Sequence, residues 1–108
     1  MNREEVLKVY EAVIASNPNF ERKGKNNPYT SANGYMFSQI NKNGELGIRL
    51  SKEATAEFDE AYGALPFLSY GAKMREYVLI PDKVLDDSKT LGYFLQKGFE
   101  HVMSLPPK

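Results

Sequence analysis

The chain has 108 residues, the usual size of one domain, so we expect residues 1–108 to form a single domain. Fourteen basic and fourteen acidic side chains cancel. This balance argues against specific nucleic-acid binding, which needs an excess of Lys and Arg to neutralise phosphates. The absence of cysteine excludes disulfides, thiolate metal sites and a cysteine nucleophile. The N-terminus is acidic and no apolar stretch reaches the ~20 residues of a membrane span, so we expect a cytoplasmic protein without membrane contact.

The first predicted element is a helix over residues 3–16, because apolar residues recur there at the helical period. The residues that follow, 17–33, are polar and carry no strong pattern. We expect this segment to be a surface connection. The alternative is a functional loop in which Arg22, Lys23 and Lys25 contact an anionic partner.

A β-hairpin follows, with strands at residues 35–41 and 45–50 around the loop Lys42-Asn43-Gly44. A glycine in the last position of a three-residue loop accepts the positive φ that a G1 bulge needs. The register of this loop gives the pairs Ile40 with Leu46, Ser38 with Ile48, and Met36 with Leu50.

Strict alternation along these strands divides their side chains between two faces of the sheet. The face expected to lie under helices carries Met36, Ile40, Leu46, Ile48 and Leu50. The opposite face carries Tyr35, Phe37, Gln39, Glu45, Gly47 and Arg49. Asn33-Gly34 also fits a tight turn, which would pair a short strand near residues 29–32 with residues 35–38.

Three further elements complete the prediction. A helix is expected from Ser51, as N-cap, to about residue 62, followed by Gly63 at its C-terminus. Residues 65–67 are expected to be a loop. A strand covers residues 74–80 and a last helix covers about residues 88–104. The order of these elements along the chain, helix, two or three strands, helix, strand and helix, predicts an α+β fold in which helices flank an antiparallel sheet.

Few residues suggest catalysis or metal binding. His101 is the single histidine and is interpreted as a residue at the rim of the last helix, because a metal site needs several ligands. Asp86-Asp87 precedes that helix, where carboxylates cap exposed N–H groups, so capping is favoured over a catalytic pair. We therefore predict no catalytic residue, no metal site and no cofactor.

Two cations, Lys73 and Arg75, enter the strand at residues 74–80 after Gly71. The favoured interpretation is a solvated strand edge whose charges deter edge-to-edge pairing. The alternative is a contact with an anion, to which Arg49 would contribute, as in a small anionic-ligand binder or an enzyme.

Several short runs resemble one known family. They are Tyr29-Thr30-Ser31-Ala32-Asn33-Gly34-Tyr35-Met36-Phe37, Gly47-Ile48-Arg49-Leu50, Tyr70-Gly71-Ala72-Lys73-Met74-Arg75-Glu76-Tyr77-Val78 and Ser104-Leu105-Pro106-Pro107-Lys108. In order and spacing they resemble the TfoX N-terminal domain-like family over residues 20–108. The resemblance implies a secretion-chaperone-like, helix-flanked antiparallel sheet that commonly forms dimers, and a link to regulators of natural competence. Those regulators carry a further C-terminal domain, which these residues do not match.

The sequence favours a non-enzymatic protein-interaction or regulatory module over an enzyme or a nucleic-acid-associated regulator. The outward sheet face is apolar in part, and aromatic residues with Arg are enriched at interfaces. We therefore predict a homodimer whose interface includes Tyr35, Phe37, Arg49 and Tyr77. The alternative is that a helix of the same chain, the first one above all, covers this face.

Overall fold

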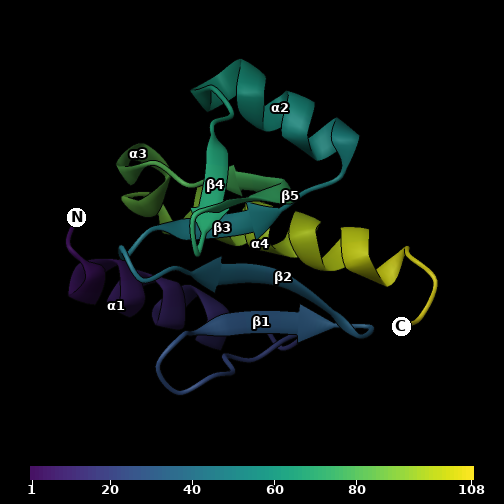
Figure 1. The fold of residues 1–108 in the computed structure, drawn as a ribbon, viewed down its shortest axis with the longest axis horizontal. Coiled ribbons are helices and arrows are strands. Elements are labelled where there is room, and N and C mark those ends of the chain that lie inside the picture. The colour runs from purple at the N-terminus through teal and green to yellow at the C-terminus, as the bar shows by residue number, and fades with distance from the viewer.

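The computed structural model describes residues Met1 to Lys108 and confirms the predicted α+β class (Figure 1). The helices are α1 (Arg3–Ala15), α2 (Lys52–Tyr62), α3 (Asp82–Leu85) and α4 (Ser88–Met103). The strands are β1 (Tyr29–Ala32), β2 (Tyr35–Ile40), β3 (Leu46–Arg49), β4 (Pro66–Ser69) and β5 (Ala72–Leu79). They form one antiparallel sheet in the order β1-β2-β3-β5-β4. None of the helices combines the length and the apolar character needed to span a bilayer.

Helices α1 and α4 lie against one face of this sheet, behind the strands in Figure 1. The core formed by the sheet and the four helices contains twenty buried apolar residues. Gly98 permits close contact here, because a Cβ at this position of α4 would lie 2.9 Å from the backbone oxygen of Arg49. The opposite face of the sheet is not covered by α1 or α4.

Helix α1 starts with a capping box, in which Asn2 accepts from the Glu5 backbone and the Glu5 side chain accepts from the Asn2 backbone. Its buried face includes Tyr10, whose hydroxyl lies 2.6 Å from the hydroxyl of Ser38 in β2. Ser38 in turn contacts the hydroxyl of Thr30 in β1. Three buried hydroxyls thus connect α1 to both strands of the first hairpin.

The turn predicted at Asn33-Gly34 is confirmed, and it joins β1 to β2. Both residues have positive φ, 57° at Asn33 and 84° at Gly34, which matches the Asn-Gly preference of two-residue hairpin turns. The Asn33 amide donates to the backbone oxygens of Val102 and Leu105, each at 2.9 Å. The end of the first hairpin is therefore hydrogen-bonded to the C-terminal end of α4.

The predicted register of β2 with β3 is confirmed for Ile40 with Leu46 and for Ser38 with Ile48. The predicted faces of Tyr35, Met36 and Phe37 are wrong. Thr30 pairs with Ser38 and the next residue of β1 pairs with Met36, so Phe37 is the extra residue of a β-bulge. A bulge reverses the alternation beyond it, which strict period-two reasoning cannot anticipate.

Phe37 consequently faces the helices and is 0% exposed. Its ring packs against Phe20 at 5.2 Å and Phe99 at 6.1 Å between centroids. Met36 lies on the other face, where its sulfur accepts from the Gln39 amide. Phe37 is a core residue of this chain, so the prediction that it forms part of an outward interface is corrected.

The loop predicted at residues 65–67 is wrong, because strand β4 begins at Pro66. Strand β4 and the start of β5 fold across the outward face of the sheet, in front of β3 in Figure 1. Phe67 stacks on Tyr77 with ring centroids 5.8 Å apart. It lies directly over Gly47, where an added Cβ would be 2.4 Å from the Phe67 ring. Helix α1 does not cover this face, and the β4–β5 hairpin covers part of it.

The remaining predicted helix ends are confirmed. Ser51 caps α2 by accepting from the Ala54 backbone, and Gly63 follows with φ 78°. Asp87 caps α4 by accepting from the backbone and the hydroxyl of Thr90, and these hydrogen bonds lower the pKa of its carboxyl. Capping is thus what Asp87 does in this fold.

Candidate binding groove and exposed hairpin

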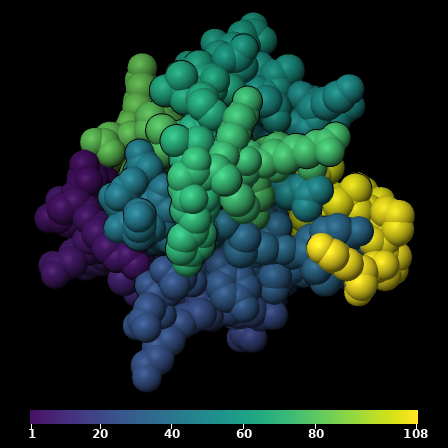
Figure 2. All heavy atoms as spheres, in the orientation of Figure 1, coloured from purple at the N-terminus to yellow at the C-terminus, as the bar shows by residue number.

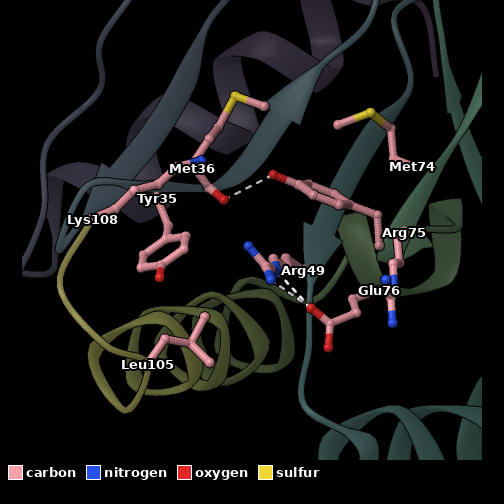
Figure 3. A pocket seen from close by; sticks show the side chains of 9 residues that line it. Tyr35, Met36, Arg49, Met74, Arg75, Glu76, Leu105 and Lys108 are labelled. Atoms are coloured by element: carbon pink, nitrogen blue, oxygen red, sulfur yellow. Dashed lines mark hydrogen bonds and ion pairs between the residues drawn. The ribbon is translucent and has the colours of Figure 1, made fainter.

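The part of the outward face that the β4–β5 hairpin leaves open forms a groove of about 520 Å3 beside Arg49 (Figure 3). Strands β2, β3 and β5 contribute to it, together with the residues after α4. The residues that line it are Tyr35, Met36, Arg49, Met74, Arg75, Glu76, Tyr77, Leu105 and Lys108. Apolar and cationic side chains share this groove, with Glu76 as its one acidic residue.

Arg49 is held in place on two sides. Its Nε and Nη2 atoms lie 2.8 and 2.6 Å from the same carboxylate oxygen of Glu76. Its guanidinium carbon lies 5.5 Å from the centre of the Tyr35 ring, and the Lys108 ammonium lies 5.4 Å from the same ring. The bulge that reorients β2 turns Tyr35 toward the end of α4, where its hydroxyl donates to the Pro106 oxygen. The remaining nitrogen of Arg49, Nη1, makes no hydrogen bond within the protein.

Glu76 occupies an unusual backbone position, with φ of 69° in strand β5. It lies where β5 bulges against β4, between the pairs Leu68 with Lys73 and Pro66 with Val78. A carboxylate oxygen of Glu76 is 3.5 Å from Nε2 of His101. Partial burial opposes its ionisation, but the hydrogen bond and charge of Arg49, helped by His101, outweigh it and lower the pKa of Glu76.

The apolar lining of the groove includes two thioethers and the ring of Tyr77. Met36 and Met74 project from neighbouring parts of the sheet on the same side of Arg49 (Figure 3). Tyr77 donates from its hydroxyl to the Met36 backbone oxygen at 3.0 Å, and burial raises its pKa. Tyr77 is therefore a fixed, neutral wall of the groove.

The structure brings together some of the residues named from sequence and separates others. Tyr35, Arg49, Tyr77 and Arg75 line the groove, whereas Lys73 lies outside it on the exposed part of the hairpin. His101 does lie at the helix rim, and its nearly buried side chain also contacts Glu76. Sequence reasoning missed Glu76, although it is the one acidic residue in an otherwise apolar and cationic strand.

A second surface lies on the solvent side of the β4–β5 hairpin, which crosses the middle of the face shown in Figure 2. Phe67 and Ser69 point to the sheet beneath, and Ser69 donates to the Gln39 side chain. Pro66, Leu68 and Tyr70 are exposed on this side, the last at 79%. We call these three residues the hairpin stripe.

Tyr70 also has a positive φ, 53°, at the first position of the turn Tyr70-Gly71, where Gly71 has 77°. Sequence reasoning missed this turn, because a Tyr-Gly pair is not a usual turn signal. No side chain within the protein hydrogen-bonds to the Tyr70 hydroxyl.

A scan against models of known protein families found no match, and a search of curated proteins found no relative. The resemblance to the TfoX N-terminal domain-like family therefore stays a prediction from short motifs. No group of three or more His, Asp or Glu side chains in the structure is arranged to hold a metal ion.

Proposed function

We propose that the protein is a non-enzymatic interaction module that self-associates through the hairpin stripe, Pro66, Leu68 and Tyr70. Membership of the TfoX N-terminal domain-like family is part of this proposal, because that family commonly forms dimers. The observation that carries it is the conformation of Tyr70, a large aromatic residue in the left-handed region and almost fully exposed.

A bulky side chain at positive φ costs free energy, and such strain persists where function requires the residue. Asn, Asp or Gly at this position would satisfy the same turn without that cost. Tyr70 obtains no compensation inside the protein, because its ring is exposed. A partner that buries the ring would offset the free-energy cost of the positive φ at Tyr70.

The chemistry of the stripe suits a second copy of the same chain. Its three side chains carry no formal charge, so two copies can face each other across a two-fold axis without repulsion. Tyr is among the residue types that contribute most to binding free energy at interfaces. Lys73, paired with Leu68 across the hairpin, would oppose strand-to-strand pairing at this edge. Contact through the faces of the two hairpins is therefore the arrangement we propose.

Light scattering coupled to gel filtration tests this proposal at micromolar concentration. The wild-type chain should elute as a dimer, and Leu68→Glu should elute as a folded monomer, because a buried unpaired charge opposes association. The matched control is Met103→Glu, because Met103 is exposed to a similar extent, 50% against 48% for Leu68, but lies on α4. A monomeric wild-type protein, or equal loss of the dimer in both variants, would contradict the proposal.

A further inference from the structure

We propose that the groove beside Arg49 binds a small organic monocarboxylate with an apolar tail. This site does not depend on self-association through the hairpin stripe, because none of the three stripe residues lines the groove. Three features of the groove carry the inference, and they concern its cation, its charge balance and its apolar wall.

The cation is preorganised. Glu76 accepts from two nitrogens of Arg49, and the Tyr35 ring lies against the guanidinium, so little side-chain entropy remains to be lost on binding. Nη1 of Arg49 makes no hydrogen bond in the protein and is a donor for an incoming oxygen. The strained backbone of Glu76, φ 69°, holds the carboxylate that fixes Arg49. Strain of this kind gathers at ligand sites.

The charge balance selects a single negative charge. The side chains of Arg49, Arg75 and Lys108 line the groove together with one carboxylate side chain, that of Glu76, so the groove attracts an anion. Glu76 has a lowered pKa and is ionised at neutral pH, so it already neutralises Arg49, the cation that the ligand would contact. A doubly charged phosphate gains little extra attraction at this point, but it loses more hydration than a carboxylate does. The geometry therefore favours a monoanion over a phosphate ester.

The apolar wall determines the chemistry of the part of the ligand beyond its carboxylate. Met36 and Met74 are thioethers, which adapt to apolar groups of different shape, and Tyr77 offers a buried ring held by its own hydrogen bond. A volume of about 520 Å3 lies within the range of sites for small organic ligands. A carboxylate bound at Arg49 would place its tail against this wall.

Nuclear magnetic resonance titration of the isotope-labelled protein provides the test, with 3-phenylpropanoate as the probe. The neutral 3-phenylpropanamide has the same tail without the charge, and phenyl phosphate carries a ring with a dianion. We expect saturable shifts of the Met36, Arg49 and Tyr77 amides with the carboxylate at millimolar concentration. We expect the amide to bind roughly tenfold more weakly, and phenyl phosphate to bind more weakly than the carboxylate.

Matched variants sharpen the result. Arg49→Lys keeps a charge beside Glu76 but loses the planar fork, and should weaken binding of the carboxylate about tenfold. Arg75→Gln should weaken it about twofold, whereas Lys73→Gln, two residues earlier and outside the groove, should leave it unchanged. If Arg49→Lys lowers the stability of the protein, the comparison of Arg75→Gln with Lys73→Gln still tests whether the ligand binds in this groove.

Glu76→Gln tests the selectivity. The ratio of phenyl phosphate affinity to carboxylate affinity should rise severalfold, because the charge that neutralises Arg49 is gone. Equal binding of the carboxylate and the amide, tighter binding of phenyl phosphate to the wild-type protein, or equal effects of the Arg75 and Lys73 variants would each overturn the proposal. An unchanged affinity ratio in Glu76→Gln would do the same.

Discussion

The two tight hairpins of this sheet have turns of the same backbone geometry, with two consecutive residues at positive φ. The first turn, Asn33-Gly34, uses the residue that this geometry prefers, and the second, Tyr70-Gly71, uses a bulky aromatic residue. Asn33 contributes hydrogen bonds to the end of α4, whereas Tyr70 is exposed. The first turn therefore stabilises the fold, and the second carries a strain that the fold does not require.

The hairpins also differ in how they are held to the rest of the protein. The first is held along its strands by the buried hydroxyls of Tyr10, Ser38 and Thr30, and at its turn by Asn33. The second is held on its sheet side by Phe67, which packs on Tyr77 over Gly47, and by Ser69, which donates to the Gln39 side chain. A hairpin fixed on its sheet side and exposed on its solvent side can present side chains to a partner without loss of the core.

The largest effect is expected from Phe67→Ala, which removes the one large side chain that holds the second hairpin to the sheet. Phe67 is fully buried, and a truncation of this kind lowers the free energy of unfolding by about 3–5 kcal/mol. Urea denaturation followed by circular dichroism measures it. Leu68→Ala on the same strand should stay within about 0.5 kcal/mol of wild type, because its side chain is exposed. If both variants lose a similar amount of stability, the distinction between the sheet side and the solvent side of the hairpin is wrong.

Alkaline pH tests how the first hairpin is held. Burial raises the pKa of Tyr10 from 10.0 to about 12, against smaller opposing effects of Ser38 and Thr30. Because the folded pKa lies above the unfolded one, the stabilisation is fully present below pH 10.0 and is lost as the pH rises to about 12. Two pKa units correspond to about 2–3 kcal/mol.

Urea denaturation across this pH window measures the loss, and Tyr10→Phe is the control. The variant starts from a lower stability because Ser38 loses a buried partner, but it should lose less stability between pH 10 and 12. An identical pH slope in the two proteins would show that Tyr10 is not the group responsible.

A smaller effect is expected at the first turn. Asn33→Ala removes the two hydrogen bonds to the C-terminal end of α4 and its following residues, and it places a residue that tolerates positive φ less well at φ 57°. We expect the free energy of unfolding to fall by about 2 kcal/mol. Asn33→Gly loses the same hydrogen bonds but accepts the backbone angle, and should cost about 1 kcal/mol. Denaturation midpoints of the two variants separate hydrogen bonding from strain. Equal values would mean that backbone strain at this turn contributes nothing.

Much of the fold follows from sequence because its signals are local. The apolar period of α1, the cap at Ser51, the capping carboxylate at Asp87 and the turn at Asn33-Gly34 each depend on a few neighbouring residues. The register of β2 with β3 followed from the loop between them. These elements could be predicted without knowledge of what packs against them.

The candidate site was harder to predict, because it depends on two bulges. One inserts Phe37 into β2 and reverses the faces of its neighbours, and the other leaves Glu76 at positive φ beside Arg49. Neither position carries glycine, the residue that most often signals such a feature. Gly47 leaves a flat place on the sheet, but the residue that fills it, Phe67, is distant in sequence and lay in a segment predicted as a loop.

The smallest effect, and the one that most directly tests the comparison of the two turns, is expected from Tyr70→Asn. This change gives the second turn the residue that the first already has, so the isolated subunit should gain about 0.5–1 kcal/mol of stability. Self-association should fall in the same variant, because the exposed aromatic ring of the hairpin stripe is lost. Denaturation at concentrations low enough to populate monomers measures the first quantity, and light scattering measures the second. A structural role for Tyr70 predicts the opposite sign for stability, so a less stable variant with unchanged association would reject the functional interpretation of this turn.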